Sequence, residues 1–372
     1  MTIEIFPTLH FLTRPSLTPG LLAFTRSGTA TRMGPRGLVE TVAADALRHD
    51  FDPATGVYLG WLVEEGRTNL ALHARDQSVT PWALSNMTAA RTAMGLDGGA
   101  ASASTLTASM AEATVSQVVT AISAAYTLSV DLRRVSGSGA VSLTLDGGAT
   151  WHAVGATLGT DRYRRVTLTQ TLANPTPGLK MGTAGDVLAS DYWQLEAGSF
   201  ATSRIPTAGA TVARGGDMPR LDPAGSWFNP TEGTVYIDAV PHPTSTAVKN
   251  LFSSSDSPKA VECSVNALPD GVHANVGAIG SGFFGASPSG MAITPGAAVR
   301  VALAYGPAGG AVLQNGTVFH GFSTGSAWTT TGLAIGHQLR NGAQRWLNGH
   351  VRHVAVFPRR LGDAQAAELT TF

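Results

Sequence analysis

The sequence predicts an all-β protein made of two antiparallel β-sandwiches in series, and three observations lead to this fold class. Its 372 residues include 43 Gly and 20 Pro, and helix breakers at this frequency leave no room for long helices. Apolar and polar residues alternate over many short stretches, which is the period of half-buried strands. Asp-Gly and Asn-Gly pairs, which form tight hairpin turns, stand between some of these stretches.

Residues 1–60 are expected to form an irregular segment ahead of the two sandwiches. Proline interrupts its short apolar pieces at Pro7, Pro15, Pro19, Pro35 and Pro53, and each proline removes a backbone donor and fixes φ. A segment of this kind cannot bury much surface by itself. We therefore expect it to lie on another surface of the protein.

The first sandwich is expected over residues 61–212. The period of two is clearest over residues 126–132 and 141–145, where apolar side chains alternate with small polar ones. The stretch Asp146-Gly147-Gly148 follows the second of these runs. Glycine permits the positive φ that tight turns require, so a hairpin is predicted there.

A linking segment, residues 196–217, has the sequence EAGSFATSRIPTAGATVARGGD. It has no charge run, no helix period and no cluster of ligand-type residues. Strand periodicity stops within it and resumes after it at GTVYIDAV. We interpret it as the last strand of the first sandwich followed by the connection to the second, and its small residues suit an edge strand and close packing between subunits.

The second sandwich is expected over residues 213–372. Asn315-Gly316 is the strongest hairpin signal of the chain, because both residues tolerate the left-handed positions of a type I′ turn. Only the C-terminus indicates a helix. Asp363 can cap the stretch AQAAELTTF, whose Ala and Glu residues favour a short helix.

Charge, cysteine content and hydropathy exclude several classes of function. The chain has 25 basic and 25 acidic residues, so it offers no electrostatic footprint for nucleic acid or an anionic membrane. It has no apolar run long enough to span a bilayer and no signal-peptide pattern, so we expect no membrane insertion and no export by a common route. The single Cys263 excludes an internal disulfide framework, is expected to pack in a strand, and indicates folding in a reducing cytoplasm.

One stretch has the spacing of a hydrolase nucleophile. Gly321, Ser323 and Gly325 satisfy Gly-x-Ser-x-Gly, but that motif requires a strand before the serine and a helix after it. The residues that follow predict a turn and a strand, and the histidines precede the acid instead of following it. We expect no catalytic residue here.

Two other pairs are weighed as metal or acid–base sites. His350 and His353 have a spacing that suits a metal on a helix, but residues three apart in a strand face opposite sides. Glu64 and Glu65 are adjacent, so they too diverge in a strand, whereas glycoside cleavage requires a convergent pair. We predict a structural contact for the glutamates, with Arg67 as a candidate partner. No metal, no cofactor and no enzymatic activity are expected.

Two regions of the N-terminal half resemble a known family when they are taken together. GVYLGWLVEEGRTNLALHARD, followed by PWALSNMTA, resembles the start of a β-sandwich module of structural proteins of tailed phages and gene-transfer particles. YWQLEAGSFATSRIPTAGATVARGGD resembles its end, so the match spans residues 58–217. Arg204 departs from the typical sequence of the family, which has an apolar or aromatic residue at this position. The resemblance implies a jelly-roll sandwich in a virion, with residues 1–60 as the attachment segment.

From about Gly233, the chain resembles a laminin-G or concanavalin A-like lectin sandwich. The resemblance rests on VRVALAYGPAGGAVLQNGTV and on GLAIGHQLRNGAQRWLNGHVRHVAVFPRRLGDAQAAELT. Some members of that superfamily bind sugars or proteins, and others keep only the scaffold. The resemblance therefore implies the fold more firmly than it implies a ligand.

A lectin-like sugar site combines an aromatic face with amide, hydroxyl or guanidinium groups. Two loops supply these groups, and the predicted carbohydrate-binding residues are Trp328, His337, Arg340 and Asn341. The alternative is that Trp328 and Trp346 pack under loops. Three other tryptophans lie in or beside strands of the first sandwich and are expected in its core: Trp82, Trp151 and Trp193.

These observations together predict a tail fibre, spike or receptor-binding protein of a virion, assembled in the host cytoplasm. Its predicted partners are other virion proteins and host-surface polysaccharide. The alternative is a head spike, decoration or base protein that holds another fibre and binds no glycan. A polysaccharide-degrading tailspike enzyme is disfavoured, because the chain has no β-helix repeat and no convergent acidic pair.

A homo-oligomer is expected from the composition of residues 77–125. This stretch contains only three charged residues, Arg91, Asp97 and Glu112. A surface so poor in charge suits a buried subunit contact. The resemblance to phage fibre proteins implies that the oligomer is a trimer.

Overall fold

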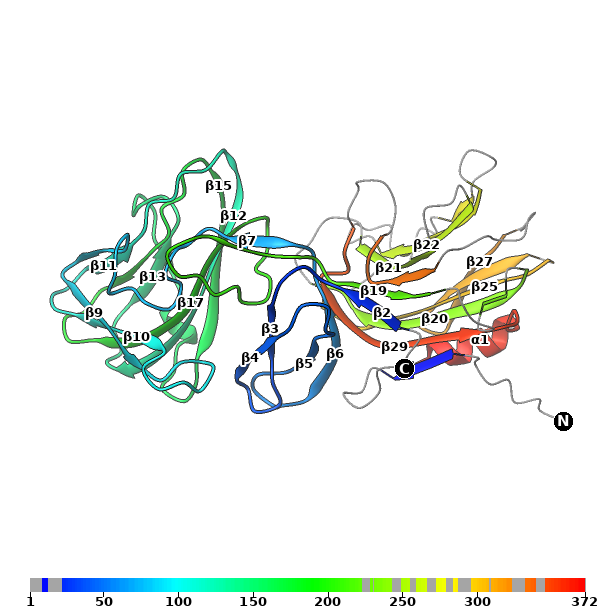
Figure 1. The fold of residues 1–372 in the computed structure, drawn as a ribbon, viewed down its shortest axis with the longest axis horizontal. Helices are drawn as coiled ribbons and strands as arrows, with labels where there is room; N and C mark the ends of the chain where they lie inside the picture. The colour runs from blue at the N-terminus through cyan, green and yellow to red at the C-terminus, as the bar shows by residue number, and fades with distance from the viewer. Residues whose placement is uncertain are drawn as a thin grey trace. The chain divides into compact units, whose positions relative to one another are not determined.

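The structure is a computed structural model, and it describes residues 9–12, 22–222, 228–229, 231–242, 249–254, 259–265, 272–278, 284–286, 296–307, 309–322, 332–338 and 345–371. Its regular elements are strands apart from a 3-10 turn and one short α-helix, α1 (Asp363–Thr370), which confirms the predicted all-β class. The chain forms two compact units (Figure 1). Unit 1 comprises residues 1–27, 42–65 and 216–372, and unit 2 comprises residues 28–41 and 66–215.

Unit 2 contains two five-stranded antiparallel sheets. The first has the order β15-β12-β17-β10-β9, with bounds β9 Met87–Ala93, β10 Ala103–Ala108, β12 Ala124–Ser136, β15 Arg164–Leu172 and β17 Val187–Ala197. The second has the order β14-β13-β16-β11-β8, with bounds β8 Ala83–Ser85, β11 Ala113–Ser116, β13 Val141–Thr144, β14 His152–Ala153 and β16 Gly178–Met181. The remaining elements are the pairs β3 (Ala30–Met33) with β4 (Val39–Val42) and β7 (Arg67–Asn69) with β18 (Val212–Arg214), and a 3-10 turn (Gly155–Thr157).

The core of unit 2 is built from both of its five-stranded sheets. Alternate residues of β12, Leu128, Val130 and Leu132, are fully buried in it, as the period of two predicts. The polar residues between them are buried as well, so β12 is not the half-buried strand expected from the sequence. Leu143 of β13 and Leu179 of β16 add buried side chains from the second sheet. Burial of such side chains supplies most of the favourable free energy of folding.

The tryptophans of unit 2 fall into two groups. Trp82 and Trp193 are buried and meet edge to face, with ring centroids 4.7 Å apart, which confirms them as core residues. Trp151 is only half-buried, and the Lys180 ammonium lies 5.1 Å from the centroid of its ring. The predicted core position of Trp151 is therefore wrong, because its place beside the short edge strand β14 leaves one side of the ring outside the sandwich.

The linking segment (residues 196–217) does not supply an edge strand of the sandwich. β17 ends at Ala197 and is the middle strand of its five-stranded sheet. The chain then has no strand until β18, and hydrogen bonds fix it to side chains of unit 2. The Thr202 amide donates to Glu196 Oε1 at 2.7 Å, and the Ile205 amide donates to Gln194 Oε1 at 2.7 Å. These side chains satisfy backbone groups that have no strand partner.

Unit 1 contains two larger antiparallel sheets. The first has the order β27-β26-β25-β20-β29-β6-β5, with β1 also paired to β29, and bounds β1 Leu9–Leu12, β5 His49–Phe51, β6 Tyr58–Val63, β20 Gly233–Val240, β25 Val299–Tyr305, β26 Gly310–Gln314, β27 Thr317–Phe322 and β29 Gly349–Phe357. The second has the order β2-β19-β28-β21-β22-β23-β24, with bounds β2 Leu22–Thr25, β19 Met218–Leu221, β21 Lys249–Ser254, β22 Lys259–Val265, β23 Val272–Ala278, β24 Phe284–Ala286 and β28 Leu333–Ile335.

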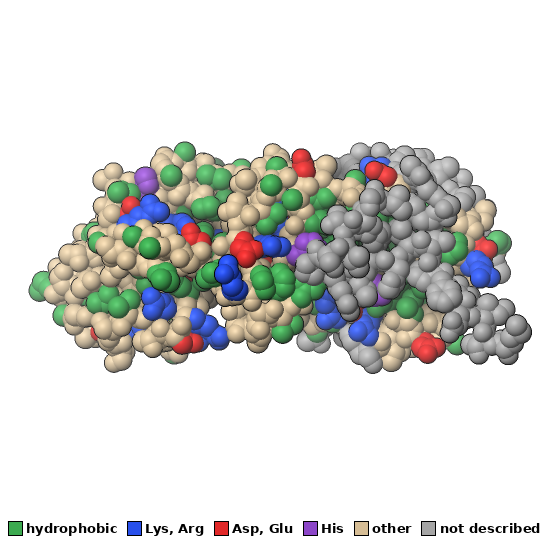
Figure 2. All heavy atoms as spheres, turned by 60° about the horizontal axis from the view of Figure 1, so that its bottom comes forward, with side chains coloured by type: hydrophobic (Ala, Val, Ile, Leu, Met, Phe, Trp, Pro, Cys, Tyr) green, Lys and Arg blue, Asp and Glu red, His purple; other side chains and the backbone are tan. Residues whose placement is uncertain are grey.

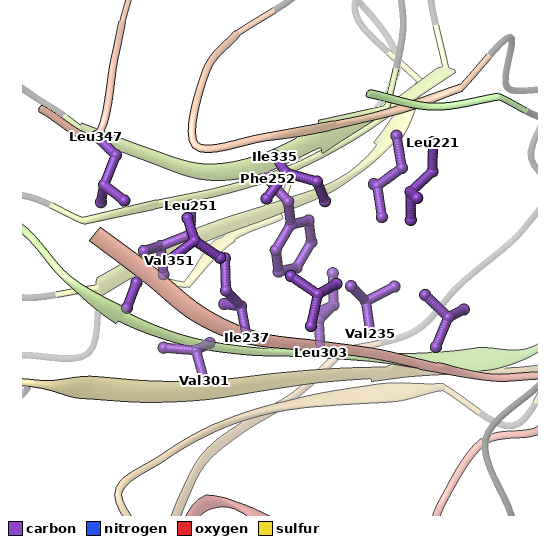
Figure 3. Close-up of a cluster of buried hydrophobic side chains, with 14 of the residues drawn as sticks. Leu221, Val235, Ile237, Leu251, Phe252, Val301, Leu303, Ile335, Leu347 and Val351 are labelled. Carbon is purple, nitrogen blue, oxygen red and sulfur yellow. The ribbon is translucent and has the colours of Figure 1, made fainter. Parts of the chain in front are cut away.

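The core of unit 1 lies between these two sheets, as Figure 3 shows. Side chains of the first sheet point toward side chains of the second, among them Ile237, Val301 and Leu303 on one side and Phe252 and Ile335 on the other. Strand β6 adds two fully buried side chains, Trp61 and Val63, to the same cluster. Residues at the start of the first expected sandwich thus help to form the core of the second.

The units differ from the division expected from the sequence, which was 1–60, 61–212 and 213–372. β6 pairs with β29 and β5 pairs with β6 in the first sheet of unit 1, while β2 pairs with β19 in the second. Most of the N-terminal segment is therefore built into unit 1, because its short apolar strands bury themselves only by joining existing sheets. Independent folding of the two units stays a prediction.

Both predicted hairpin turns are confirmed. Asn315 and Gly316 have φ angles of 47° and 83° between the paired strands β26 and β27, as a type I′ turn requires. Gly147 and Gly148 have φ angles of 74° and 95° between β13 and β14, which also pair antiparallel. Glycine carries little strain in this region of φ.

Helix α1 is confirmed, but its cap differs from the prediction. The N-cap is Gly362, and the Gln365 side chain accepts a hydrogen bond from the Gly362 amide at 3.2 Å. Asp363 instead lies in the first turn and pairs with Arg360 at 2.8 Å. A carboxylate in this turn stabilises the helix through the helix dipole.

Charged side chains are scattered over the surface. On the face drawn in Figure 2, basic and acidic groups lie among hydrophobic and uncharged ones, with no large area of one sign. Within residues 77–125, the large apolar side chains that are exposed are Val79, Leu84, Met94, Met110, Val118 and Ile122. They fit the expected subunit contact, and the trimer stays a prediction. Among the described residues, no helix is long and apolar enough to cross a membrane.

Candidate functional site

The predicted sugar-binding residues are only partly within the described structure. Trp328, Arg340 and Asn341 lie outside the described residues, so their role stays a prediction. His337 is described and follows β28. The residues on either side of the segment 339–344, which contains Arg340 and Asn341, define what supports that segment.

His337 is a core residue in this structure. It is 2% exposed, and its Nε2 atom lies 3.1 Å from the backbone oxygen of Pro219. Its ring stacks on Trp346 with centroids 6.5 Å apart and an interplanar angle of 24°. The two residues also form an antiparallel backbone bridge. The position of His337 therefore indicates support of the loop and leaves little of its ring for direct contact with a sugar.

Trp346 closes the other side of the same segment. It is buried, and its Nε1 atom donates a hydrogen bond to the backbone oxygen of Asp217 at 2.9 Å. This confirms for Trp346 the alternative in which the ring packs beneath loops. We call the pair His337 and Trp346 the loop base, because the two residues flank residues 338–345 in sequence and form a backbone bridge with each other.

Burial lowers the pKa of His337 to about 4. A histidine held neutral in the folded state takes up a proton on unfolding. The contribution of His337 to the stability of the fold is therefore fully present above about pH 6.5 and is lost as the pH drops toward 4. We expect the wild-type protein to lose on the order of 3 kcal/mol of stability over this range through His337. Urea unfolding of His337→Gln should show a smaller loss over the same range, with the exposed His152→Gln as the control; equal pH dependence in all three proteins would contradict this.

Below the loop base lies a buried ion network of four side chains, Arg26, Arg48, Glu64 and Asp217. Arg26 donates to Asp217 Oδ1 at 3.0 Å, and Arg48 pairs with Asp217 and, at 2.9 Å, with Glu64. The side chains of both arginines and of Asp217 are 0% exposed. The Glu64 amide also donates to Asp217 Oδ2 at 2.9 Å. The network joins segments that lie up to 191 residues apart in sequence.

Charge balance explains why this network can be buried. Two guanidinium groups face two carboxylates, so no net charge is left without a partner. Burial opposes the charged form of Arg48, but Asp217 and Glu64 more than offset it and hold its pKa above the usual value. Glu64 thus has the structural contact predicted for it, and the partner shown is Arg48. Such a network specifies how chain segments meet, and it offers no chemistry to a substrate.

A second polar group stands beside the loop base. The Glu65 carboxylate accepts a hydrogen bond from Asn348 Nδ2 at 3.0 Å, and the Glu65 amide donates to Asn348 Oδ1 at 2.8 Å. Burial lowers the pKa of Lys249 to about 8, and its ammonium donates to the backbone oxygen of His242. The Glu65 and Asn348 contacts join the ends of β6 and β29, and the Lys249 contact joins the start of β21 to the residues after β20.

The outer side of the first sheet of unit 1 carries an arginine cluster, Asp238, Arg300 and Arg352, on three neighbouring strands. Asp238 accepts hydrogen bonds from Arg300 at 3.0 Å and from Arg352 at 2.8 and 2.9 Å. The side chains of Arg300 and Arg352 are 26% and 37% exposed. These three residues were not among the site residues predicted from the sequence. The signal of this cluster was a charged residue within each of three apolar strands.

His350 and His353 of β29 face the same side of the sheet, so the prediction that they face opposite sides is wrong. β29 has an extra residue at Arg352 in its pairing with β20, and such a bulge resets the alternation. His350 lies 2.8 Å from Asp50, whereas His353 packs edge to face on Tyr236 with centroids 5.0 Å apart. The described part of the chain holds no group of three or more His, Cys, Asp or Glu residues that could bind a metal.

Other candidates from the sequence fall partly outside the described structure. Gly321 lies in β27, but Ser323 and Gly325 lie outside the described residues. Cys263 lies in β22, as its expected strand position predicts, and its side chain is outside the described part.

Comparison with known proteins finds only distant similarity to solved structures. No family model matches it, and no curated protein matches it. Similar solved structures include the CBM40 domain of Ruminococcus gnavus IT-sialidase bound to alpha2,3 sialyllactose, at 16% identity and a TM-score of 0.34, covering 39% of this chain and 84% of that one. Another is domain 4 of AbnA, a GH43 extracellular arabinanase from Geobacillus stearothermophilus, in complex with arabinotriose, at 14% identity and a TM-score of 0.35, covering 46% and 82%. These values are too low to carry an argument about ligands.

Proposed function

We propose that this chain is a structural component of a phage or phage-like particle, a tail fibre, spike or receptor-binding protein, which attaches to host-surface polysaccharide through unit 1. The observation that carries the proposal is the loop base. His337 and Trp346, on either side of the segment that contains Arg340 and Asn341, are buried and form a backbone bridge with each other. We assign the protein no catalytic role.

The ion network supports the structural part of the proposal. Glu64 and Asp217 belong to the two stretches that resemble the phage module, and both are buried in pairs with arginines. Their place is architectural. The particle itself, with its other structural proteins as partners, is the proposed location of the chain.

Sugar binding is tested with the multimeric protein on glycan arrays and with whole particles on host cells. Shallow lectin sites desolvate little area, so we expect a Kd of about millimolar for one site, and avidity raised roughly 10²-fold or more by repetition on a particle. Trp328→Ala and Arg340→Ala should each weaken binding about tenfold, which is roughly 1.4 kcal/mol. Arg359→Ala, an exposed arginine of the same unit, is the matched control and should bind normally.

The alternative is a head spike, decoration or base protein that holds another fibre without binding glycan. The burial of His337 favours it, because one of the four predicted sugar-binding residues has little surface to offer. No array signal, together with unchanged adsorption by both alanine variants, would leave this alternative.

A further inference from the structure

The four outer strands of the two five-stranded sheets of unit 2 are protected against pairing to different degrees. An edge strand exposes backbone N–H and C=O groups, and proteins block such edges with short strands, charges or bulges. β8 has three residues and β14 has two. β9 has seven, but it carries Arg91, and its register with β10 shifts between Ala103 and Thr105. Three of the four edges therefore carry a recognised protection.

β15 lacks these protections over most of its length. It has nine residues, and its pairing with β12 runs through all nine without a shift of register. Its charged residues are the first two, Arg164 and Arg165, so the stretch VTLTQTL from Val166 to Leu172 is uncharged. In Figure 1 it lies beside β12, and it stands at the end of its sheet. Every residue of unit 2 is described, so this edge is open within the unit.

The side chains of β15 are self-complementary. An antiparallel second copy, placed about a two-fold axis at Thr169, would set Thr167 opposite Thr171 and Val166 opposite Leu172. Because the side-chain period of a strand is two, this register keeps threonines on one face and mainly apolar residues on the other. The three threonines are exposed, and the apolar residues Leu168 and Leu172 are only half-buried.

The same register brings together favourable neighbours and no like charges. Cross-strand threonine pairs stabilise sheets, and one already exists inside the unit, where Thr127 Oγ1 lies 2.8 Å from Thr169 Oγ1. Arg165 would face Ala173, so the arginines of the two copies would not stand opposite each other. Arg165 is also held on its own sheet by Ser129 at 2.8 Å.

We propose that β15 pairs antiparallel with β15 of a second copy of this chain, joining two five-stranded sheets into one. The contact is isologous, so it closes on itself and gives a dimer instead of a fibre. The proposal goes beyond the function proposed above and does not depend on glycan binding. It is also separate from the trimer expected from residues 77–125, which do not include β15.

Disulfide trapping tests the register in the full chain with Cys263→Ser. A residue on the two-fold axis lies opposite its own copy, with Cβ atoms about 4.5–5.5 Å apart, so Thr169→Cys should give a linked dimer on mild oxidation. Thr167→Cys should link poorly alone and well when mixed with Thr171→Cys. Thr88→Cys on the exposed part of β9 is the matched control. Equal linking of Thr88→Cys and Thr169→Cys, or no linking of Thr169→Cys, would overturn the proposal.

Sedimentation provides a second test without cysteine. Lysine blocks edge pairing, so Thr167→Lys combined with Thr169→Lys should weaken dimerisation by about tenfold or more. Circular dichroism should show that this variant is still folded. Thr88→Lys should leave dimerisation unchanged. A wild-type protein that is monomeric at micromolar concentration, or an oligomer that is indifferent to the two lysines, would show that β15 does not join two copies.

Discussion

Replacing Asp217 with alanine should lower the free energy of unfolding of unit 1 by about 3–5 kcal/mol, the range found when one partner of a buried ion pair is removed. The Asp217 carboxylate is the shared partner of Arg26 and Arg48, and all three side chains are 0% exposed. Its loss leaves two buried guanidinium groups with only Glu64 as an ionic partner in the network. It also removes the acceptor of the Glu64 amide.

Urea unfolding followed by fluorescence measures this loss. Asp222→Ala is the matched control, because the Asp222 side chain is 52% exposed and its pair with Arg220 lies at the surface. That change should cost about 0–1 kcal/mol. Asp217→Asn should fall between the two, since the amide keeps the shape but not the charge. A loss for Asp217→Ala no larger than that of the control would show that the network does not stabilise unit 1.

A fragment of residues 216–372 should not fold by itself, although the sequence alone suggests a complete second sandwich there. It would lack β6, whose Trp61 and Val63 side chains are fully buried in the core of unit 1. It would also lack both arginines of the ion network. Loss of one large aromatic core side chain costs about 3–5 kcal/mol, and a domain is stable by only about 5–15 kcal/mol.

Fragment complementation checks this expectation. Residues 216–372 alone should show no cooperative unfolding transition, whereas co-expression with residues 1–65 should restore one, because that fragment returns β2, β5, β6 and both arginines. Co-expression with residues 1–65 carrying Arg48→Ala is the matched control. It should restore a weaker transition, with its midpoint at a lower urea concentration. A cooperative transition in the lone fragment would mean that the N-terminal strands are dispensable to unit 1.

Local features of the chain could be predicted well. Turns such as Asn315-Gly316 depend on the φ preferences of two residues, and strands such as β12 depend on a period that the residues themselves display. The cap of α1 is one residue from its predicted position, since Gly362 and Asp363 compete for it and only the backbone geometry decides. Trp82 and Trp193 were found by the same local pattern, which failed for Trp151 at the short edge strand.

The candidate site could be predicted only in part. An aromatic ring near amide and guanidinium groups is a pattern typical of sugar sites, and it led to the prediction of His337, Arg340 and Asn341. The sequence does not say which of these side chains turns inward. The contacts of His337 with Pro219 and Trp346 show that the His337 side chain turns inward. The arginine cluster could not be predicted from the sequence, because Asp238, Arg300 and Arg352 lie on three separate strands that only sheet pairing brings together.

The sequence by itself determined the all-β class, the hairpins, the C-terminal helix and the absence of any strong charge pattern, because all of these depend on residues close together along the chain. The tertiary structure decided which strands share a core. Trp61 and Val63 lie between the two segments of unit 2 in sequence but pack in unit 1, and Asp217 pairs with arginines 169 and 191 residues away. Long-range pairings of this kind depend on the shape and charge balance of the assembled core. Each segment carries only one of the two partners, so the pairing cannot be read from that segment alone.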